Sequence, residues 1–311
     1  MVGVAVISYN TREHLRACLE SVPLSEVREV VVVDNASRDG SPEMVSDEFP
    51  WVTLVANEQN RGYGAAANQA VAGSAAETLL LLNGDTRLEP GALPSLVAYL
   101  EDHPEAAVVA PRLVNADGSL QPSCYPFPGT LEWLFDNDVV GRVVKRMSIS
   151  SQNLLRTWDH AHARAVPWVK GAALAVRRGA FETVGGFDER FFLYYEETDL
   201  CDRMWTVRWE VHFAPTATVM HIVGASTAQH RTAMNVQLLE SVDEFYRHHY
   251  SYPRRLLLAA IWKGILTSRL LRDRARLVTA RDERARHAIA ADVAAWECAL
   301  LGRKPSWDRP A

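Results

Sequence analysis

Two acidic residues stand where long apolar runs of this sequence stop. The run "VVVVD" ends at Asp34, the run "LLLLNGD" ends at Asp85, and "NEQNRGYG" (57–64) gives a third apolar segment a polar end. If these runs are strands of an open parallel sheet, their carboxyl ends meet at one edge, where such sheets bind ligands. Carboxylates at that edge suit sugar hydroxyls, a base N–H, or a divalent cation such as Mg²⁺ or Mn²⁺.

The alternative interpretation is that each acid is only a turn residue, because Asp is common where a chain leaves a strand. For Asp34 or Asp85 alone the two interpretations are equally good. Three polar ends that should meet at one edge of a sheet favour a shared ligand site. Gly84, just before Asp85, would let a ligand approach the backbone closely.

The elements that would position these acids alternate along the first hundred residues. The apolar runs are residues 4–8, 27–34, 52–56 and 78–83. Helical spacing follows each run, and Ser41-Pro42 has the residue types of an N-cap and a first helical position. This alternation predicts an α/β fold with a mostly parallel central sheet covered by helices on both faces.

The pattern changes after residue 105. Residues 106–123 predict an antiparallel excursion with a turn at 115–118, and residues 119–166 are irregular. A long irregular stretch of this kind is typical of a lid or a substrate loop. The later pattern predicts a strand at residues 166–178, a helix at 196–205 and a second strand at 211–221. From residue 243 onward it predicts basic helix.

Composition limits the classes of function. The chain has 311 residues, is 48% hydrophobic and carries a formal net charge of −5, so nothing global indicates a nucleic-acid binder. Its four cysteines are far apart and form no CxxC pair, which fits a reducing cytosol and excludes a disulfide framework. We expect a soluble, cytoplasmic chain, because the N-terminus resembles a strand and not a signal peptide, and because Lys263 interrupts the most apolar late segment.

Five segments in the same order resemble the motifs of family 2 glycosyltransferases, most closely those of rhamnosyltransferase-like members. They are "VVVVDNASRDGS" (30–41), "NRGYGAAAN" (60–68), "LLLLNGDTRL" (79–88), the long "WVKGAAL…CDRM" (168–204) and "HIVGAS" (221–226). The resemblance implies a GT-A fold, a nucleotide-sugar donor, a divalent metal and inversion at the anomeric carbon. It implies a catalytic domain over residues 1–228, with a nucleotide-sugar half to about 115 and an acceptor half after it, and a basic helical region over 229–311.

The resemblance also assigns residues to the donor. Asp34 resembles the acid that holds the nucleobase, and Asn83 could bind a ribose hydroxyl. The other residues expected to bind nucleotide or diphosphate are Ser8, Asn10, Asn60, Arg61, Gly62, Asn68 and Asp85. Arg61 could pair with phosphate, although an ordinary solvated arginine explains it equally well, and Asn68 could merely cap polar backbone.

Asn83-Gly84-Asp85 occupies the place of the family's DxD motif and departs from it at the first position. Asn83 brings no charge, so metal binding would depend on Asp85, the donor diphosphate and one further ligand. His221 resembles the histidine that supplies that ligand, and imidazole suits Mn²⁺. The resemblance therefore implies Mg²⁺ or Mn²⁺ at Asp85 and His221, although a lone histidine after a strand is more often structural.

Several acids gather in "EETDLCDRM", where Glu197 resembles the second acid of the family's ED motif and thus the general base. Glu196 would lie beside it on the acceptor side, and the two glutamates could exchange roles. Acids also favour the first turn of a helix, and Asp199 with Arg203 has the spacing of an ion pair. The other residues that the resemblance places near the sugar or acceptor are Trp168, Gly171, Ala172 and Asp188, and each has a structural alternative in the core or a loop.

The last part of the chain is basic, with eleven arginines and lysines between residues 247 and 286. A basic amphipathic helix can lie on an anionic membrane surface, which would suit a lipid-linked acceptor and a peripheral position at the cytoplasmic face. A solvated face of helices packed on the catalytic domain, or a surface between two copies of the chain, fits the pattern equally well.

The sequence favours an inverting glycosyltransferase that uses dTDP-rhamnose and acts on a cell-surface glycan or a lipid-linked sugar. A UDP- or GDP-sugar donor is the alternative within the family. A sugar nucleotidyltransferase would want a glycine-rich phosphate loop after the first strand, and "SYNTREHL" has no glycine. An inactive nucleotide-sugar-binding protein is disfavoured, because all of Asp34, Asp85, Glu197 and His221 are present.

Overall fold

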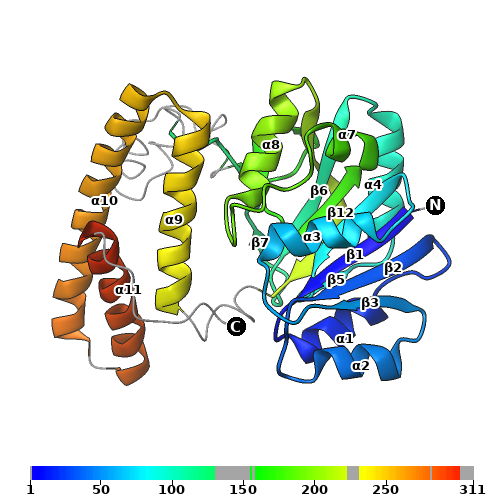
Figure 1. Ribbon diagram of the computed structural model, residues 1–311, viewed down its shortest axis with the longest axis horizontal. Coiled ribbons are helices and arrows are strands. Elements are labelled where there is room, and N and C mark those ends of the chain that lie inside the picture. Colours follow the sequence, from blue (N-terminus) through cyan, green and yellow to red (C-terminus); the bar gives the residue numbers. More distant parts are fainter. Residues whose placement is uncertain (1, 130–154, 156–157, 223–230, 281, 302–311) are drawn as a thin grey trace. The chain divides into compact units, whose positions relative to one another are not determined.

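The computed structural model describes residues 2–129, 155, 158–222, 231–280 and 282–301 (Figure 1). The chain divides into two compact units. The first comprises Met1–Glu189 with Glu196–Ala225, and the second comprises Arg190–Tyr195 with Ser226–Ala311.

The first unit is built on one large sheet, with a separate two-stranded sheet beside it. The strands of the large sheet are β1 (Val2–Ser8), β2 (Val27–Asp34), β3 (Val52–Ala56), β4 (Thr78–Asn83), β5 (Thr86–Leu88), β6 (Ala106–Val114), β7 (Leu120–Gln121), β9 (Arg164–Ala165), β11 (Ala173–Arg177) and β12 (Glu210–His221). The two-stranded sheet pairs β8 (Cys124–Tyr125) with β10 (Trp168–Val169).

The order of the large sheet is β3-β2-β1-β4-β11-β6-β12-β5, with β7 beside β6 and β9 beside β12. Strands β1 to β4 are parallel, and so are β6 and β12. Strand β11 is inserted antiparallel between β4 and β6, so both parallel groups run in the same direction. Their carboxyl ends therefore lie at one edge of the sheet.

Helices cover both faces of this sheet, as the alternation in sequence predicts. One apolar core joins the sheet to α1 (Arg12–Glu20), α2 (Ser41–Glu48) and α4 (Ala92–Asp102). The other joins it to α3 (Tyr63–Ala72), α7 (Arg178–Thr183) and α8 (Glu196–Thr206). Leu79 to Leu82 alternate between the two cores, which is why this strand is apolar at every position.

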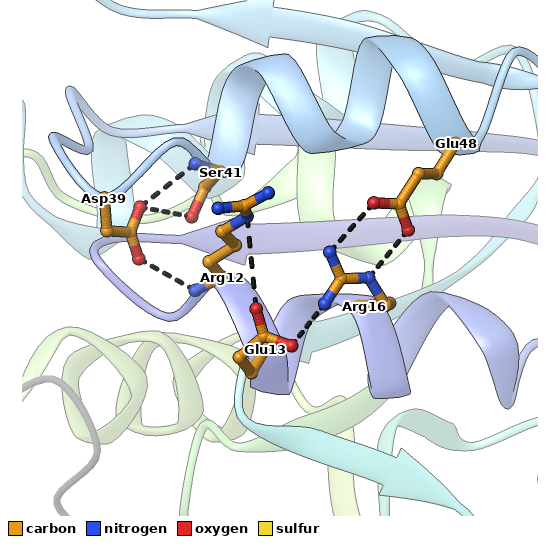
Figure 2. Close-up of polar contacts among 6 residues, drawn as sticks. All are labelled: Arg12, Glu13, Arg16, Asp39, Ser41 and Glu48. Carbon is orange, nitrogen blue, oxygen red and sulfur yellow. Dashed lines mark hydrogen bonds and ion pairs between the residues drawn. The ribbon is translucent and has the colours of Figure 1, made fainter.

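Charged side chains fix α1 to α2 and to the loop between β2 and α2 (Figure 2). Asp39 accepts the backbone N–H of Arg12 at 2.8 Å and the Ser41 hydroxyl at 2.6 Å. Arg16 forms a bidentate pair with Glu48, at 2.6 and 2.8 Å, and this pairing holds the pKa of the Glu48 carboxyl below its usual range. Because these groups are exposed, their main effect is to fix the loop that follows Asp34 and not to add much stability.

The predicted strands at 27–34, 52–56 and 78–83 agree with β2, β3 and β4. Two expectations need correction. Gly40, with φ of +80°, is the N-cap of α2, and Ser41 is already helical because its hydroxyl bonds to Asp39. The predicted strand at 166–178 is interrupted after Val169, because the chain leaves β8 there and joins β4.

The second unit consists of α9 (Arg231–His249), α10 (Tyr252–Thr279) and α11 (Glu283–Leu301), so the helical region begins before residue 243. Helix α11 contacts both others: Asn235 donates to Asp292 at 2.8 Å, and the Trp296 indole donates to the buried Asp273 at 3.2 Å. In the part of the chain that the structure describes, no helix combines the length and apolarity needed to cross a membrane. Most of the irregular 119–166 stretch lies outside the described residues.

Candidate active site

Polar side chains end three adjacent strands at the carboxyl edge of the sheet. Ser8 pairs in register with Asp34 across β1 and β2, and Asn83 ends β4 beside Ile7 of β1. Asp34 is 1% exposed, and its Oδ1 accepts the backbone N–H of Ser37 at 2.8 Å. Its Oδ2 is buried and has no hydrogen-bond partner among the described residues. Burial raises the pKa of this carboxyl, so an N–H donor from a ligand would stabilise it.

Asn10 helps to shape the loop that follows Asp34. Its Oδ1 accepts the backbone N–H of Arg38, and its own N–H donates to the Ser37 hydroxyl, both at 2.8 Å. Asn10 has a positive φ of 52°, which asparagine tolerates better than most residues. These bonds give Asn10 a local structural role next to Asp34.

Asn35, which sequence reasoning missed, organises the second loop at this edge. Its amide donates to the Asn60 side chain at 2.8 Å and to the Gly62 carbonyl at 3.1 Å, and its oxygen accepts the Arg61 N–H at 3.0 Å. Gly62, with φ of +85°, is the N-cap of α3, a conformation that favours glycine. Asn60 and Gly62 therefore form the loop, and the Asn60 side chain is engaged within it.

Arg61 and Asn68 contact the segment that follows α7. The half-exposed Arg61 guanidinium lies 3.7 Å from the Glu189 carboxylate. Asn68 bonds in both directions with the backbone of Phe187, at 2.9 Å each. The Asn68 side chain therefore satisfies the backbone N–H and carbonyl of Phe187, which is the structural alternative to binding the donor.

Gly84 is needed by the protein's own packing. A Cβ at this position would lie 2.9 Å from the Thr11 hydroxyl and 3.3 Å from Ser8, so a larger residue would force these side chains to shift. The turn therefore presses Asn83 and Asp85 against the end of β1. The Asn83 Oδ1 is buried without a hydrogen-bond partner among the described residues, so it is available to a hydroxyl donor.

Asp85 and His221 face each other across the carboxyl ends of β4 and β12. His221 Nδ1–H donates to the Gln121 side-chain oxygen at 2.7 Å, and the Gln121 amide donates to the His221 carbonyl and to Asn115. In the tautomer that the bond to the Gln121 oxygen favours, Nδ1 carries the hydrogen and the lone pair of Nε2 faces Asp85 Oδ1, 3.5 Å away. Two acceptors directed at each other fit a cation between them, and a hydrogen-bonded outer nitrogen is typical of metal-binding histidines.

Glu196 and Glu197 begin helix α8, and each has one buried carboxylate oxygen without a hydrogen-bond partner among the described residues. Burial, together with the charge of Glu197, raises the pKa of Glu196 well above its usual value. Burial also raises the pKa of Glu197, opposed by backbone N–H groups and by the Lys170 ammonium. The backbone N–H groups at the helix start and the Lys170 ammonium thus offset part of the effect of burial on Glu197. Asp199 forms the expected ion pair with Arg203, at 2.6 Å.

Tyr63 connects the two halves of the site, although sequence reasoning did not single it out. Its hydroxyl donates to the Gly171 carbonyl at 2.9 Å. Burial raises its pKa, and so do the charges of Glu196, Glu197 and Asp85. The Tyr63 ring is partly buried, and its hydroxyl lies within electrostatic reach of all three carboxylates.

The residues expected near the acceptor occupy the turn between β10 and β11. The Gly171 N–H approaches a Glu197 oxygen at 3.5 Å, and the Ala172 carbonyl accepts the N–H of Asn83 at 2.9 Å. The Trp168 indole donates to the Pro126 carbonyl at 2.9 Å and its ring stacks on Tyr125. Asp188 lies partly buried in the loop after α7. Gly171 and Ala172 thus join Glu197 to the end of β4.

A second cluster with metal-type ligands lies at the opposite edge of the sheet. Glu105, Glu210 and His212 offer ligand atoms within 4.8 Å of one another at the amino ends of β6 and β12. His212 already has a partner on each ring nitrogen, Tyr99 at 3.0 Å and Glu210 at 2.8 Å. These two hydrogen bonds satisfy the imidazole, so the geometry here does not call for a cation.

Sequence comparison matches the chain to one family model and to several relatives. The model of the family described as "Glycosyl transferase family 2" matches residues 3–157. An N-acetylglucosaminyl-diphospho-decaprenol L-rhamnosyltransferase of Mycobacterium tuberculosis (strain ATCC 25618 / H37Rv) is 30% identical over 297 residues, covering 89% of this chain and 96% of that protein. The dTDP-rhamnosyl transferase RfbF of Shigella flexneri is 23% identical over 258 residues, covering 79% of this chain and 77% of that protein.

Two solved structures are similar in fold. The mannosyltransferase PcManGT from Pyrobaculum calidifontis, in complex with GDP-Man and Mn²⁺, has a TM-score of 0.57 at 20% identity and covers 97% of this chain and 88% of that one. GalNAc-T7 with UDP, GalNAc and Mn²⁺ has a TM-score of 0.52 at 15% identity and covers 79% and 49%. At these identities the likeness concerns the fold alone.

Proposed function

The chain is a rhamnosyltransferase-like member of glycosyl transferase family 2 with the GT-A fold, and we propose that it inverts the anomeric carbon while it transfers L-rhamnose from dTDP-rhamnose. One observation carries this proposal. Four buried acceptor oxygens without partners among the described residues belong to Asp34, Asn83, Glu196 and Glu197 at the carboxyl edge of the sheet. Unpaired buried acceptors are costly, and a donor molecule rich in hydroxyl and N–H groups would satisfy them.

The donor would lie along the ends of β2, β1 and β4. The free oxygen of Asp34 suits the N–H of a pyrimidine base, and Asn83 suits a ribose hydroxyl. The names of the relatives from M. tuberculosis and S. flexneri support rhamnose, and the second supports the dTDP form. A UDP- or GDP-sugar is the alternative, because the likeness to PcManGT, which was solved with GDP-Man, concerns the same fold.

We propose that Asp85 and His221 hold Mg²⁺ or Mn²⁺, because their facing acceptor atoms fit a cation. Such an ion would offset the negative charge of the diphosphate. Asn83 contributes no carboxylate, so the protein supplies one anionic ligand and one imidazole, and donor oxygens complete the set.

Glu197 would act as the general base. As the acceptor oxygen bonds to the anomeric carbon, its proton passes to the Glu197 carboxylate. The bond from that carbon to the diphosphate breaks, and its electron pair leaves with the nucleoside diphosphate. Neutral Glu196 beside it would hold an acceptor hydroxyl, because a protonated carboxyl can donate as well as accept. Gly171 supports Glu197 from the strand side.

For the acceptor we propose a lipid-linked sugar or a growing cell-surface glycan. The name of the M. tuberculosis relative supports a diphospho-polyprenol sugar for that protein. A lipid-linked acceptor would bring the catalytic unit to a membrane surface, where a peripheral position at the cytoplasmic face would suit it. Association between copies of the chain stays a prediction.

The test measures thermal unfolding with dTDP-rhamnose and with UDP- and GDP-sugars, each with and without Mn²⁺. The true donor should raise the unfolding midpoint, because a ligand that binds only the folded state stabilises it by mass action. Release of dTDP from dTDP-rhamnose upon addition of a polyprenyl-diphosphate sugar tests the transfer. Protection by every donor alike, or by none, would contradict the proposal.

A further inference from the structure

Helix α10 of the second unit has two unlike faces. Leu258, Leu266 and Asp273 are buried, and Trp262 and Trp296 enclose the Arg269 guanidinium at 5.9 and 5.6 Å on the same side. This face packs within the helical unit, where α10 lies alongside α11 (Figure 1). The opposite face is exposed along the whole length of the helix.

The exposed face of α10 is unusually apolar. Of nine large apolar residues that are exposed in the described chain, five lie on this one helix: Tyr252, Leu256, Leu257, Leu271 and Val278. Leu271 is 62% and Val278 is 87% exposed. By contrast, Leu24, Trp51 and Val207 of the first unit are single exposed residues on separate elements, which is ordinary for a protein surface.

These residues form a continuous stripe. At about 100° per residue, the exposed apolar and small residues fall within a sector of roughly 100°. We define the apolar stripe of α10 as Pro253, Leu256, Leu257, Ala260, Gly264, Leu271, Ala275 and Val278. Two polar residues fall inside this sector, Thr267 and, at its edge at the angle of Leu256, Arg274, so the stripe is apolar over most of the helix.

Basic residues border the apolar stripe on both sides. Lys263 and Arg274 flank it on one side, and Arg254 and Arg272 on the other. Helix α10 carries seven basic residues and one acid, Asp273, which is buried and bonded to Arg272 and Trp296. The exposed surface of the helix therefore carries a net positive charge, although Arg274 pairs with Glu297 at 2.5 Å.

We infer that α10 lies flat on an anionic membrane surface, with the apolar stripe among the acyl chains and the flanking arginines and lysine at the lipid phosphates. An apolar stripe between two basic borders is typical of helices that lie in the interface. The same geometry disfavours a second copy of the chain as occupant, because two basic borders would face each other. On the membrane surface the enzyme would reach a lipid-linked acceptor, and in this respect the inference rests on the proposed function.

The test uses the full chain and vesicles of phosphatidylcholine, alone or mixed with phosphatidylglycerol, in a sedimentation assay. The variant L256Q/L257Q/L271Q removes apolar area, and L24Q/V207Q removes exposed apolar area from the first unit as the matched control. We expect the first variant to bind anionic vesicles about tenfold more weakly or worse, and the control to bind like the wild type.

A second variant, K263E, reverses the charge of an exposed border residue for which the described chain shows no ion-pair partner. Attraction of basic residues to anionic lipid predicts a loss of about tenfold or more on mixed vesicles, no comparable change on phosphatidylcholine, and weaker wild-type binding in high salt. Equal unfolding midpoints of all variants would show that the fold is intact.

The inference is overturned if the wild type binds neither kind of vesicle, or if the control variant loses as much binding as the apolar variant. It is also overturned if the apolar variant converts a dimer to a monomer in sedimentation velocity while vesicle binding is unchanged. Transfer to a water-soluble acceptor, measured on the same proteins, tests the proposed function separately, so either idea can fail alone.

Discussion

Strand β12 carries a histidine near each end, and the two histidines show how a ligand site differs from a satisfied cluster. His212, at the amino end, has partners at 3.0 and 2.8 Å on its two ring nitrogens. His221, at the carboxyl end, has one such partner, Gln121, and turns Nε2 to a carboxylate oxygen 3.5 Å away. Both histidines lie near a carboxylate, so the presence of an acid near a histidine does not by itself identify a metal site.

The polar groups around the two ends of β12 also differ in whether their hydrogen bonds are satisfied. At the carboxyl edge, buried oxygens of Asp34, Asn83, Glu196 and Glu197 lack partners among the described residues. At the amino edge, Arg177 donates to the carbonyls of Ala106 and His103 and closes the polar groups there. The edge with unfulfilled hydrogen-bonding capacity is the one suited to bind a ligand.

The largest effect should follow from Glu197→Gln. The amide cannot accept the acceptor's proton, so we expect turnover to fall by about 10²–10⁴-fold. Protection against unfolding by the donor should persist, because the amide is nearly isosteric. Glu210→Gln at the amino edge is the matched control and should keep full turnover. Full activity of Glu197→Gln would assign the base to another residue.

A smaller effect should follow from Gln121→Met, which leaves both Asp85 and His221 in place. Without the carbonyl that accepts Nδ1–H, the imidazole loses its fixed orientation and tautomer. Loss of such an outer partner typically weakens metal binding about 10–100-fold. The measurement is the Mn²⁺ concentration that gives half of the donor's thermal protection. If that Mn²⁺ concentration did not change, Gln121 and His221 would have no role in binding the metal.

Gln121 also illustrates what the sequence could not supply. Local apolar patterns predicted β2, β3 and β4 and hence the positions of Asp34 and Asp85, because a buried parallel strand leaves a continuous signal in the chain. Gln121 lies 100 residues from His221, and Tyr63 lies 108 residues from Gly171. Such contacts depend on tertiary packing, which a single sequence does not display.

The same limit applies to Gly84 and to the turn before β11. The sequence suggested that Gly84 lets a ligand approach the backbone, which stays a prediction, and the structure adds that Thr11 and Ser8 of the same protein lie where its side chain would be. A glycine in a sequence indicates that another group approaches the backbone closely, but it does not show whether that group is a ligand or part of the protein. Likewise, the apolar segment 166–178 gave no sign that it divides between two sheets.

Lys170→Met should change the pH dependence of turnover more than its maximum. The Lys170 ammonium lowers the pKa of Glu197, against the larger effect of burial. Glu197 must be ionised to act as a base, so turnover rises as pH increases through its pKa. Removing the positive charge disfavours the ionised form and raises that pKa. The acidic limb of the pH–rate profile should therefore move to higher pH, and a limb that stays in place would exclude this coupling.

The smallest effect on catalysis should come from the amino edge, through His212→Gln. This change removes the buried imidazole that joins the half-buried Tyr99 hydroxyl to the partly exposed Glu210 carboxylate, and a hydrogen bond of this kind typically contributes about 0.5–1.5 kcal/mol. Denaturant unfolding should show that loss in the free energy of unfolding, while turnover and Mn²⁺ dependence stay at wild-type values. If Mn²⁺ dependence changed instead, the cation would bind between Glu105, Glu210 and His212, and the contrast between the two ends of β12 would be reversed.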